Sequence, residues 1–211
     1  MTNDIDLKKL EKEVWTSYFE DGFLDIIIGL ILLVSILSST LSELEVADLI
    51  RISIYVPLMF LCPVIYVLGK KYVTIPRLGL VKFSPERKAK RTKVIIIMVI
   101  SQLVLLTILF IAIVKPFEVG FLLSIIVTLN IFVAFALIAY YLDYSRMYII
   151  GVLFAMSEPM YYFLDHNTNI THIGLIAYGI PAIIILVMGT VALWQFLQKY
   201  PLPSEGTANG N

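Results

Sequence analysis

The sequence predicts an all-α integral membrane protein, a bundle of about six transmembrane helices. The first observation is composition: of 211 residues, 59% are hydrophobic and 15% are charged, and the mean hydropathy is +0.90. Soluble domains have about 45–50% apolar and about 25% charged residues. The second is that the apolar residues form six segments close to the ~20 residues that cross a bilayer. The third is that nine of the sixteen Lys and Arg residues lie together between two of these segments, within 70–93.

The N-terminal segment, 1–21, is expected to form a cytoplasmic amphipathic helix. Apolar side chains recur at helical spacing between Asp4 and Glu20, at Leu7, Leu10, Val14 and Tyr18. Such a stripe fits an interfacial helix that lies along the bilayer surface. It fits equally a helix that packs on the protein's own basic loop. The sequence leaves both interpretations open.

The transmembrane domain is expected over 22–198. Its spans are predicted at about 22–42, 49–69, 94–114, 119–142, 147–164 and 173–198. The fifth span is the weakest, because Glu158-Pro159 interrupts it and proline removes a helical hydrogen bond. A polar tail, 199–211, is expected to be disordered.

Charge sets the expected orientation, since loops rich in Lys and Arg stay in the cytoplasm. With the N-terminus inside, fourteen of the sixteen basic residues are cytoplasmic, and Lys115 and Arg51 lie outside. Both termini are therefore predicted to be cytoplasmic. If the fifth span were re-entrant, the C-terminus would lie outside instead.

The basic loop, 70–93, is expected to have a defined shape. Residues Tyr72–Ile75 and Leu80–Phe83 are rich in β-branched and aromatic types, and Pro76–Gly79 between them is typical of a turn, so a short β-hairpin is predicted. Ser84 and Pro85 then suit an N-cap and a first helical residue. The loop can act as a topology anchor that attracts anionic headgroups. It can also dock a cytoplasmic protein or a phosphorylated ligand. The residues singled out for docking are Arg77, Gly79, Lys82 and Arg87.

Two carboxylates near the start of the first span, Asp21 and Asp25, lie one helical turn apart. Charged groups in a membrane need a partner because they are costly to bury alone. Asp25 is expected near the cytoplasmic end, where Arg77 or Arg146 could meet it. We expect a structural latch between the first helix and the basic loop, and a functional carboxylate is the alternative.

Glu158 is the charged residue expected deepest in the membrane, about 18 Å along the helix from Arg146. Three roles are open for it: a structural ion pair with Arg51, a site on an ion or proton path, or an outer residue that reaches water. A pair with Arg51 would satisfy both groups.

Short motifs in the first part of the chain resemble a known group of proteins. They are Trp15, Asp21-Gly22 with Asp25 and Gly29, and Ile75-Pro76-Arg77-Leu78-Gly79-Leu80-Val81-Lys82-Phe83. This stretch, about Trp15 to Lys93, resembles a group of uncharacterised prokaryotic multi-pass membrane proteins. The resemblance implies a prokaryotic cell membrane and no particular activity.

Two function classes follow. A non-catalytic membrane subunit or regulator that docks a cytoplasmic partner through the basic loop is favoured, because the spans contain few polar residues. A small ion or solute transporter or channel that uses Glu158 is the alternative. No nucleophile–base pair or metal-ligand pattern is visible, so we expect no enzyme, catalytic residue, metal or other cofactor. Nucleic acid is not an expected partner, and homo-oligomerisation is left open.

Overall fold

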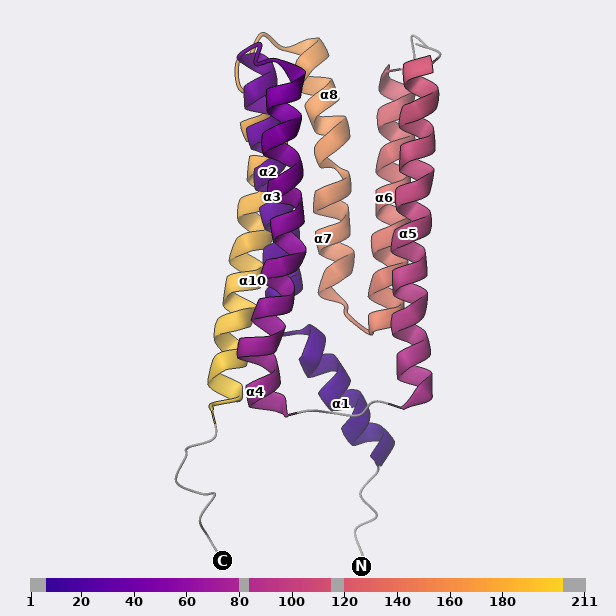
Figure 1. Ribbon diagram of the computed structural model, residues 1–211, viewed down its shortest axis with the longest axis vertical. Helices are drawn as coiled ribbons and strands as arrows, with labels where there is room; N and C mark the ends of the chain where they lie inside the picture. Colours follow the sequence, from indigo (N-terminus) through magenta and orange to yellow (C-terminus); the bar gives the residue numbers. More distant parts are fainter. Residues whose placement is uncertain (1–6, 80–83, 115–119, 203–211) are drawn as a thin grey trace, which may run out of the picture.

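The computed structural model describes residues 7–79, 84–114 and 120–202. Within these ranges the chain forms helices and no strand, and six of the helical stretches are long and apolar enough to cross a membrane (Figure 1). The elements in chain order are α1 (Leu7–Phe19), α2 (Phe23–Glu43), α3 (Asp48–Gly69), the π-helix η1 (Lys70–Thr74), α4 (Ile75–Leu78), α5 (Pro85–Val114), α6 (Gly120–Leu142), α7 (Arg146–Ala155), α8 (Ser157–Asn167), α9 (Ile173–Ala177) and α10 (Gly179–Lys199).

Six spans were expected, and the described residues contain six helical stretches of sufficient length and hydropathy. The fifth consists of α7 and α8, and together they run the length of the bundle (Figure 1). The break between them falls at Met156, before Pro159. A proline ring clashes with the carbonyl four residues earlier, which explains why the helix is disturbed on the N-terminal side of Pro159. Ser84 and Pro85 also act as expected: α5 begins at Pro85, and the Arg87 N–H lies 3.5 Å from the Ser84 hydroxyl.

The spans form two groups joined by α7 and α8. On one side α2 packs between α3 and α10, and on the other α5 packs against α6 (Figure 1). The helix pair α7–α8 contacts α6 and also reaches α10 and α2. The span formed by α9 and α10 is the most buried, and α5 and α6 are the least buried. We use the term "α1 end" for the end of the bundle where α1, α4, the start of α5 and the end of α10 lie.

Close contact between α2 and α10 depends on glycine. A Cβ atom on Gly189 would lie 2.9 Å from the Asp25 Cβ atom and 2.9 Å from the Ile26 backbone nitrogen. On the other helix, Gly22 has φ +80 and faces the backbone of Gly189. The two backbones approach this closely because neither glycine has a side chain.

Helix α1 packs on the protein itself. Trp15 and Phe19 are buried in the main core, and the Trp15 indole N–H donates to the Leu142 carbonyl at 2.9 Å. The Ser84 N–H, at the end of the basic loop, donates to the Glu11 carboxylate at 2.8 Å. These contacts favour the second of the two interpretations left open by the sequence. An interfacial position of α1 stays a prediction.

The expected hairpin in the basic loop is wrong in its first half. Residues Tyr72–Ile75 lie in η1 and at the start of α4, and Leu80–Phe83 lie outside the described residues. The β propensity of this stretch gives way because tertiary contacts decide such weak preferences. Here Lys70 and Thr74 both reach the buried Asp21 from a continuous helical backbone. Gly79 ends α4 at φ +78 and ψ 173, an extended backbone conformation with positive φ that glycine adopts readily and other residues do not.

Candidate functional site at the α1 end of the bundle

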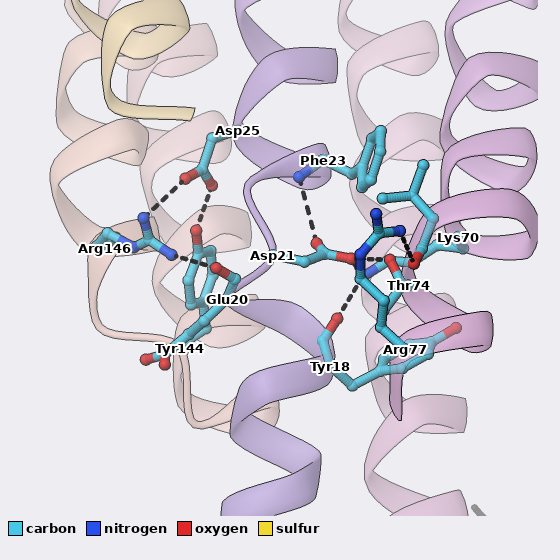
Figure 2. A network of polar contacts seen from close by, with 11 residues as sticks. Tyr18, Glu20, Asp21, Phe23, Asp25, Lys70, Thr74, Arg77, Tyr144 and Arg146 are labelled. Carbon is cyan, nitrogen blue, oxygen red and sulfur yellow. Dashed lines mark hydrogen bonds and ion pairs between the residues drawn. The ribbon is translucent and has the colours of Figure 1, made fainter. Parts of the chain in front are cut away.

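A buried carboxylate, Asp21, lies at the centre of a polar network at the α1 end (Figure 2). It follows α1 and precedes Gly22, whose positive φ lets the chain turn sharply into α2. The Lys70 ammonium donates to Asp21 Oδ2 at 2.7 Å, and the Thr74 hydroxyl donates to the same oxygen. The Phe23 N–H donates to Asp21 Oδ1 at 3.2 Å. Both carboxylate oxygens therefore have partners, as a buried charge requires.

The ammonium of Lys70 is almost fully enclosed. Its side chain is 5% exposed, and besides Asp21 it donates to the Tyr18 carbonyl. It also lies 4.2 Å from the centre of the Tyr18 ring, within cation–π range. The pair thus connects the α1–α2 junction to the π-helix that follows α3.

The second buried carboxylate, Asp25, is held by the turn between α6 and α7. The Tyr144 hydroxyl donates to Asp25 Oδ1, and Arg146 Nη1 lies 3.6 Å from Asp25 Oδ2 (Figure 2). Arg146 also donates to the Glu20 carbonyl at 2.9 Å. Burial, followed by the neighbouring Asp25 charge, raises the pKa of Tyr144 far above its usual value, so this hydroxyl stays protonated and donates.

The turn between α6 and α7 also contacts the N-terminal part of α5. Asp143 adopts φ +55, a conformation that Asp and Asn tolerate better than most residues. Its Oδ2 atom lies 2.5 Å from Arg87 Nη1 and 3.2 Å from Lys90 Nζ. Partial burial raises the pKa of Asp143, but the hydrogen bonds and charges of Arg87 and Lys90 together bring it below its ordinary value.

The network joins segments that are far apart in sequence. Residues Leu142–Arg146 contact α1 through Trp15, α2 through Asp25, and α5 through Arg87 and Lys90. The hydrogen bond from Ser84 to Glu11 adds a link from α1 to the end of the basic loop, and it lowers the pKa of Glu11. The arrangement holds the basic segment against the bundle at two positions, Lys70 and Arg87.

The residues expected at this site differ in where they lie and what they contact. Asp21 meets the basic segment at Lys70 and Thr74. Of the two partners expected for Asp25, Arg146 is found beside it and Arg77 is not. Arg77 is half-buried and donates to the Val73 carbonyl at 2.9 Å. Gly79 has open space around it, and Lys82 lies outside the described residues. Arg87 pairs with Asp143.

Sequence reasoning missed Lys70, Thr74, Tyr144 and Asp143. A usable signal existed for Asp143, because the positive-inside rule puts 143–146 on the same side as the basic loop. An acidic residue beside many cations is a natural partner for them. No comparable signal marked Thr74 or Tyr144, whose hydroxyl groups became partners only through packing.

The pair expected between Glu158 and Arg51 is not formed. Arg51 Nη2 lies 2.6 Å from Asp48 Oδ1 on its own helix, and the pair is exposed at the opposite end of the bundle. Glu158 instead accepts a hydrogen bond from the Tyr178 hydroxyl at 3.2 Å. Among the described residues, no three His, Cys, Asp or Glu side chains gather in a way that could hold a metal ion.

No family model, curated protein or solved structure matches the chain.

Proposed function

We propose that this protein is a non-catalytic membrane subunit or regulator that docks a cytoplasmic protein through its basic segment, 70–93. The observation that supports the proposal is that the cations of this segment fall into two groups. Some bind the protein's own carboxylates and fix the segment in place. Others are exposed at the α1 end and have no such partner among the described residues.

The fixed group consists of Lys70, Arg87 and Lys90. Lys70 pairs with the buried Asp21, and the other two pair with Asp143. A segment that served only to orient the protein in the membrane would need positive charge and no defined position. The segment is held at two positions, which is more than orientation in the membrane requires.

The outward group consists of Lys71, Lys88, Arg91 and Lys93, all with exposed side chains. No ion pair joins them to a carboxylate in the part of the chain that the structure describes. Cations held on a fixed surface steer and orient a partner of opposite charge. An acidic face of a cytoplasmic protein is the partner that fits this surface.

The test is native mass analysis of the tagged protein extracted gently from its own membrane. We expect a stoichiometric second polypeptide with the wild type, and its loss with Lys88→Glu or Arg91→Glu. Lys199→Glu is the matched control, because it reverses one exposed charge at the same end on α10 and should keep the partner. Unchanged melting temperatures would show that the variants are folded.

Two outcomes would contradict docking. One is a wild-type protein with no second polypeptide. The other is a bound polypeptide that both α5 variants retain. If the variants lose only affinity for vesicles that contain anionic lipid, the segment is a lipid anchor and the docking function is wrong.

A second candidate function is transport of an ion or small solute past Glu158. The specific observation in its favour is that Glu158 lies where two spans are interrupted, at Met156 and at Tyr178. Transporters commonly place substrate or coupling-ion sites at such discontinuous helices. Glu158→Gln should then abolish a flux in reconstituted vesicles while the protein stays folded, and a flux that persists in Glu158→Gln would exclude this role.

A further inference from the structure

Two neighbouring spans are broken beside Glu158. One break, at Met156, separates α7 from α8, and the other, at Tyr178, separates α9 from α10. The hydrogen bond from the Tyr178 hydroxyl to Glu158 Oε1, at 3.2 Å, directly joins the two breaks. A carboxylate and a phenol thus meet where both helices are interrupted.

Each break is followed by a proline that leaves a carbonyl without its helical donor. Pro159 has no N–H for the carbonyl of Ala155, and Pro181 has none for the carbonyl of Ala177. Both alanines are buried, at 1% and 0% exposed. A carbonyl that has lost its i+4 donor can accept from another group or contact a cation.

Tyrosine side chains gather near the carboxylate. Tyr161 of α8 stacks on Tyr178 with ring centres 5.5 Å apart, and Tyr55 of α3 lies within electrostatic range of Glu158. Tyr178 contacts Glu158 directly, and Tyr161 adjoins it through Tyr178. The three tyrosines offer hydroxyl groups and no positive charge.

Glu158 therefore has no cation from the chain. Its expected partner, Arg51, binds Asp48, and no Lys, Arg or His forms an ion pair with Glu158 among the described residues. An ionised carboxylate without a counter-charge is costly inside a membrane protein. One added positive charge removes this cost, whereas a divalent ion would leave an excess charge of the opposite sign.

We propose that Glu158 binds one exchangeable monovalent cation, a proton or an alkali metal ion, with the Tyr178 hydroxyl as its second oxygen ligand or hydrogen-bond partner. The inference deepens the second candidate function, since it names the charge class that the Glu158 site takes. It concerns binding and does not require transport. A protein that binds the cation and shows no flux would exclude transport and keep the site.

The test measures melting temperature of the purified protein in detergent, in choline chloride and in sodium, lithium or potassium chloride at equal ionic strength. Each salt is used at neutral and at alkaline pH. We expect the wild type to be least stable in choline at alkaline pH, where neither a proton nor an alkali ion is supplied. Glu158→Gln should lose this response, because a neutral amide needs no cation.

Two further variants make the result specific. Tyr178→Phe keeps the stacking on Tyr161 and removes one oxygen, so it should weaken the response and provides a test even if Glu158→Gln fails to fold. Glu86→Gln neutralises an exposed carboxylate on α5 and should respond as the wild type does. A response to pH alone identifies a proton, and a response to one alkali ion identifies that ion. The proposal is overturned if the wild type responds to neither, or if Glu158→Gln or Tyr178→Phe responds as strongly as the wild type.

Discussion

At the scale of single residues, the ion pair between Asp21 and Lys70 shows how strongly the network depends on complete pairing. Both side chains are buried, and Lys70 Nζ lies 2.7 Å from Asp21 Oδ2. Removing one partner of such a pair leaves an uncompensated charge, whereas replacing both can be nearly neutral.

We therefore predict that Asp21→Asn or Lys70→Met alone lowers the free energy of unfolding by about 3–5 kcal/mol. The double variant should recover much of that loss. Denaturant unfolding in detergent micelles measures the three values. Asp48→Asn is the control, because it breaks the exposed pair with Arg51 and should cost less than about 1 kcal/mol. Additive losses in the double variant would contradict a direct interaction between the two side chains.

A pH-dependent contact is predicted at Asp143. Its pKa in the folded protein is lowered by Arg87 and Lys90, and its value in an unfolded chain is about 3.9. The contribution of Asp143 to stability is therefore fully present above about pH 3.9 and is lost as pH falls through the lower folded-state pKa. We expect the protection of backbone amides in the first turns of α5 against hydrogen exchange, relative to an unstructured chain at the same pH, to fall in that acid range.

Asp143→Asn is the matched variant for this prediction. Asparagine tolerates φ +55 and removes the charge, so the backbone of the turn should be kept. The variant should be less protected than the wild type at neutral pH and show no further loss of protection in the acid range. Parallel pH curves for the two proteins would show that Asp143 does not hold α5.

At the scale of helices, the contact between α2 and α10 is limited by backbone distance. An added methyl group at Gly189 meets the Asp25 Cβ atom and the Ile26 nitrogen at 2.9 Å, so one helix must move. At Gly179, also on α10, the nearest atom is Ile36 Cδ1 at 3.6 Å, an ordinary contact distance.

We predict that Gly189→Ala lowers the free energy of unfolding by about 1–3 kcal/mol through overpacking. Gly179→Ala should be neutral or stabilise by up to about 1 kcal/mol, because alanine favours a helix more than glycine does. Unfolding of both variants in the same detergent gives the comparison. Equal effects at the two positions would mean that the helices are not in close contact at Gly189.

At the scale of the whole molecule, apolar side chains cover the outer faces of the spans. Large hydrophobic residues such as Phe60 on α3, Phe110 on α5 and Leu129 on α6 are 57–71% exposed. Water does not tolerate an apolar surface of this extent, whereas lipid does. The bundle therefore belongs in a bilayer, and the two ends of its helices face opposite aqueous sides.

Orientation is the prediction at this scale. The positive-inside rule puts the α1 end in the cytoplasm. Cys62 is the single cysteine, so Cys62→Ser gives a background without thiols. In that background, Lys71→Cys and Lys88→Cys should react with a membrane-impermeant maleimide only in inside-out vesicles.

The opposite end supplies the control. Leu44→Cys and Ile170→Cys lie in two turns that the contact between His172 Nδ1 and Glu43 Oε2, at 3.0 Å, holds together. Both should react in intact cells. Reaction of Ile170→Cys and Lys71→Cys from the same side would mean that α7 and α8 do not cross the membrane.

The six apolar helical stretches and the start of α5 at Pro85 were predictable from the sequence alone. These depend on local properties: the number of consecutive apolar residues, and the fit of Ser84 and Pro85 to a helix N-terminus. The interruption of the fifth span near Pro159 was predictable for the same reason.

Which polar groups meet was not predictable and depends on how the helices pack. Asp21 pairs with Lys70, 49 residues away, and Glu158 meets Tyr178 instead of Arg51. Residues 70–78 are helical because their contacts with Asp21 outweigh a weak preference for strands. Hydropathy predicts that a helix crosses the membrane. It does not predict how the helix is rotated about its own axis or which helices lie beside it. Inside a bilayer these are set by close packing and by the pairing of the few buried charges, which depend on all the helices at once.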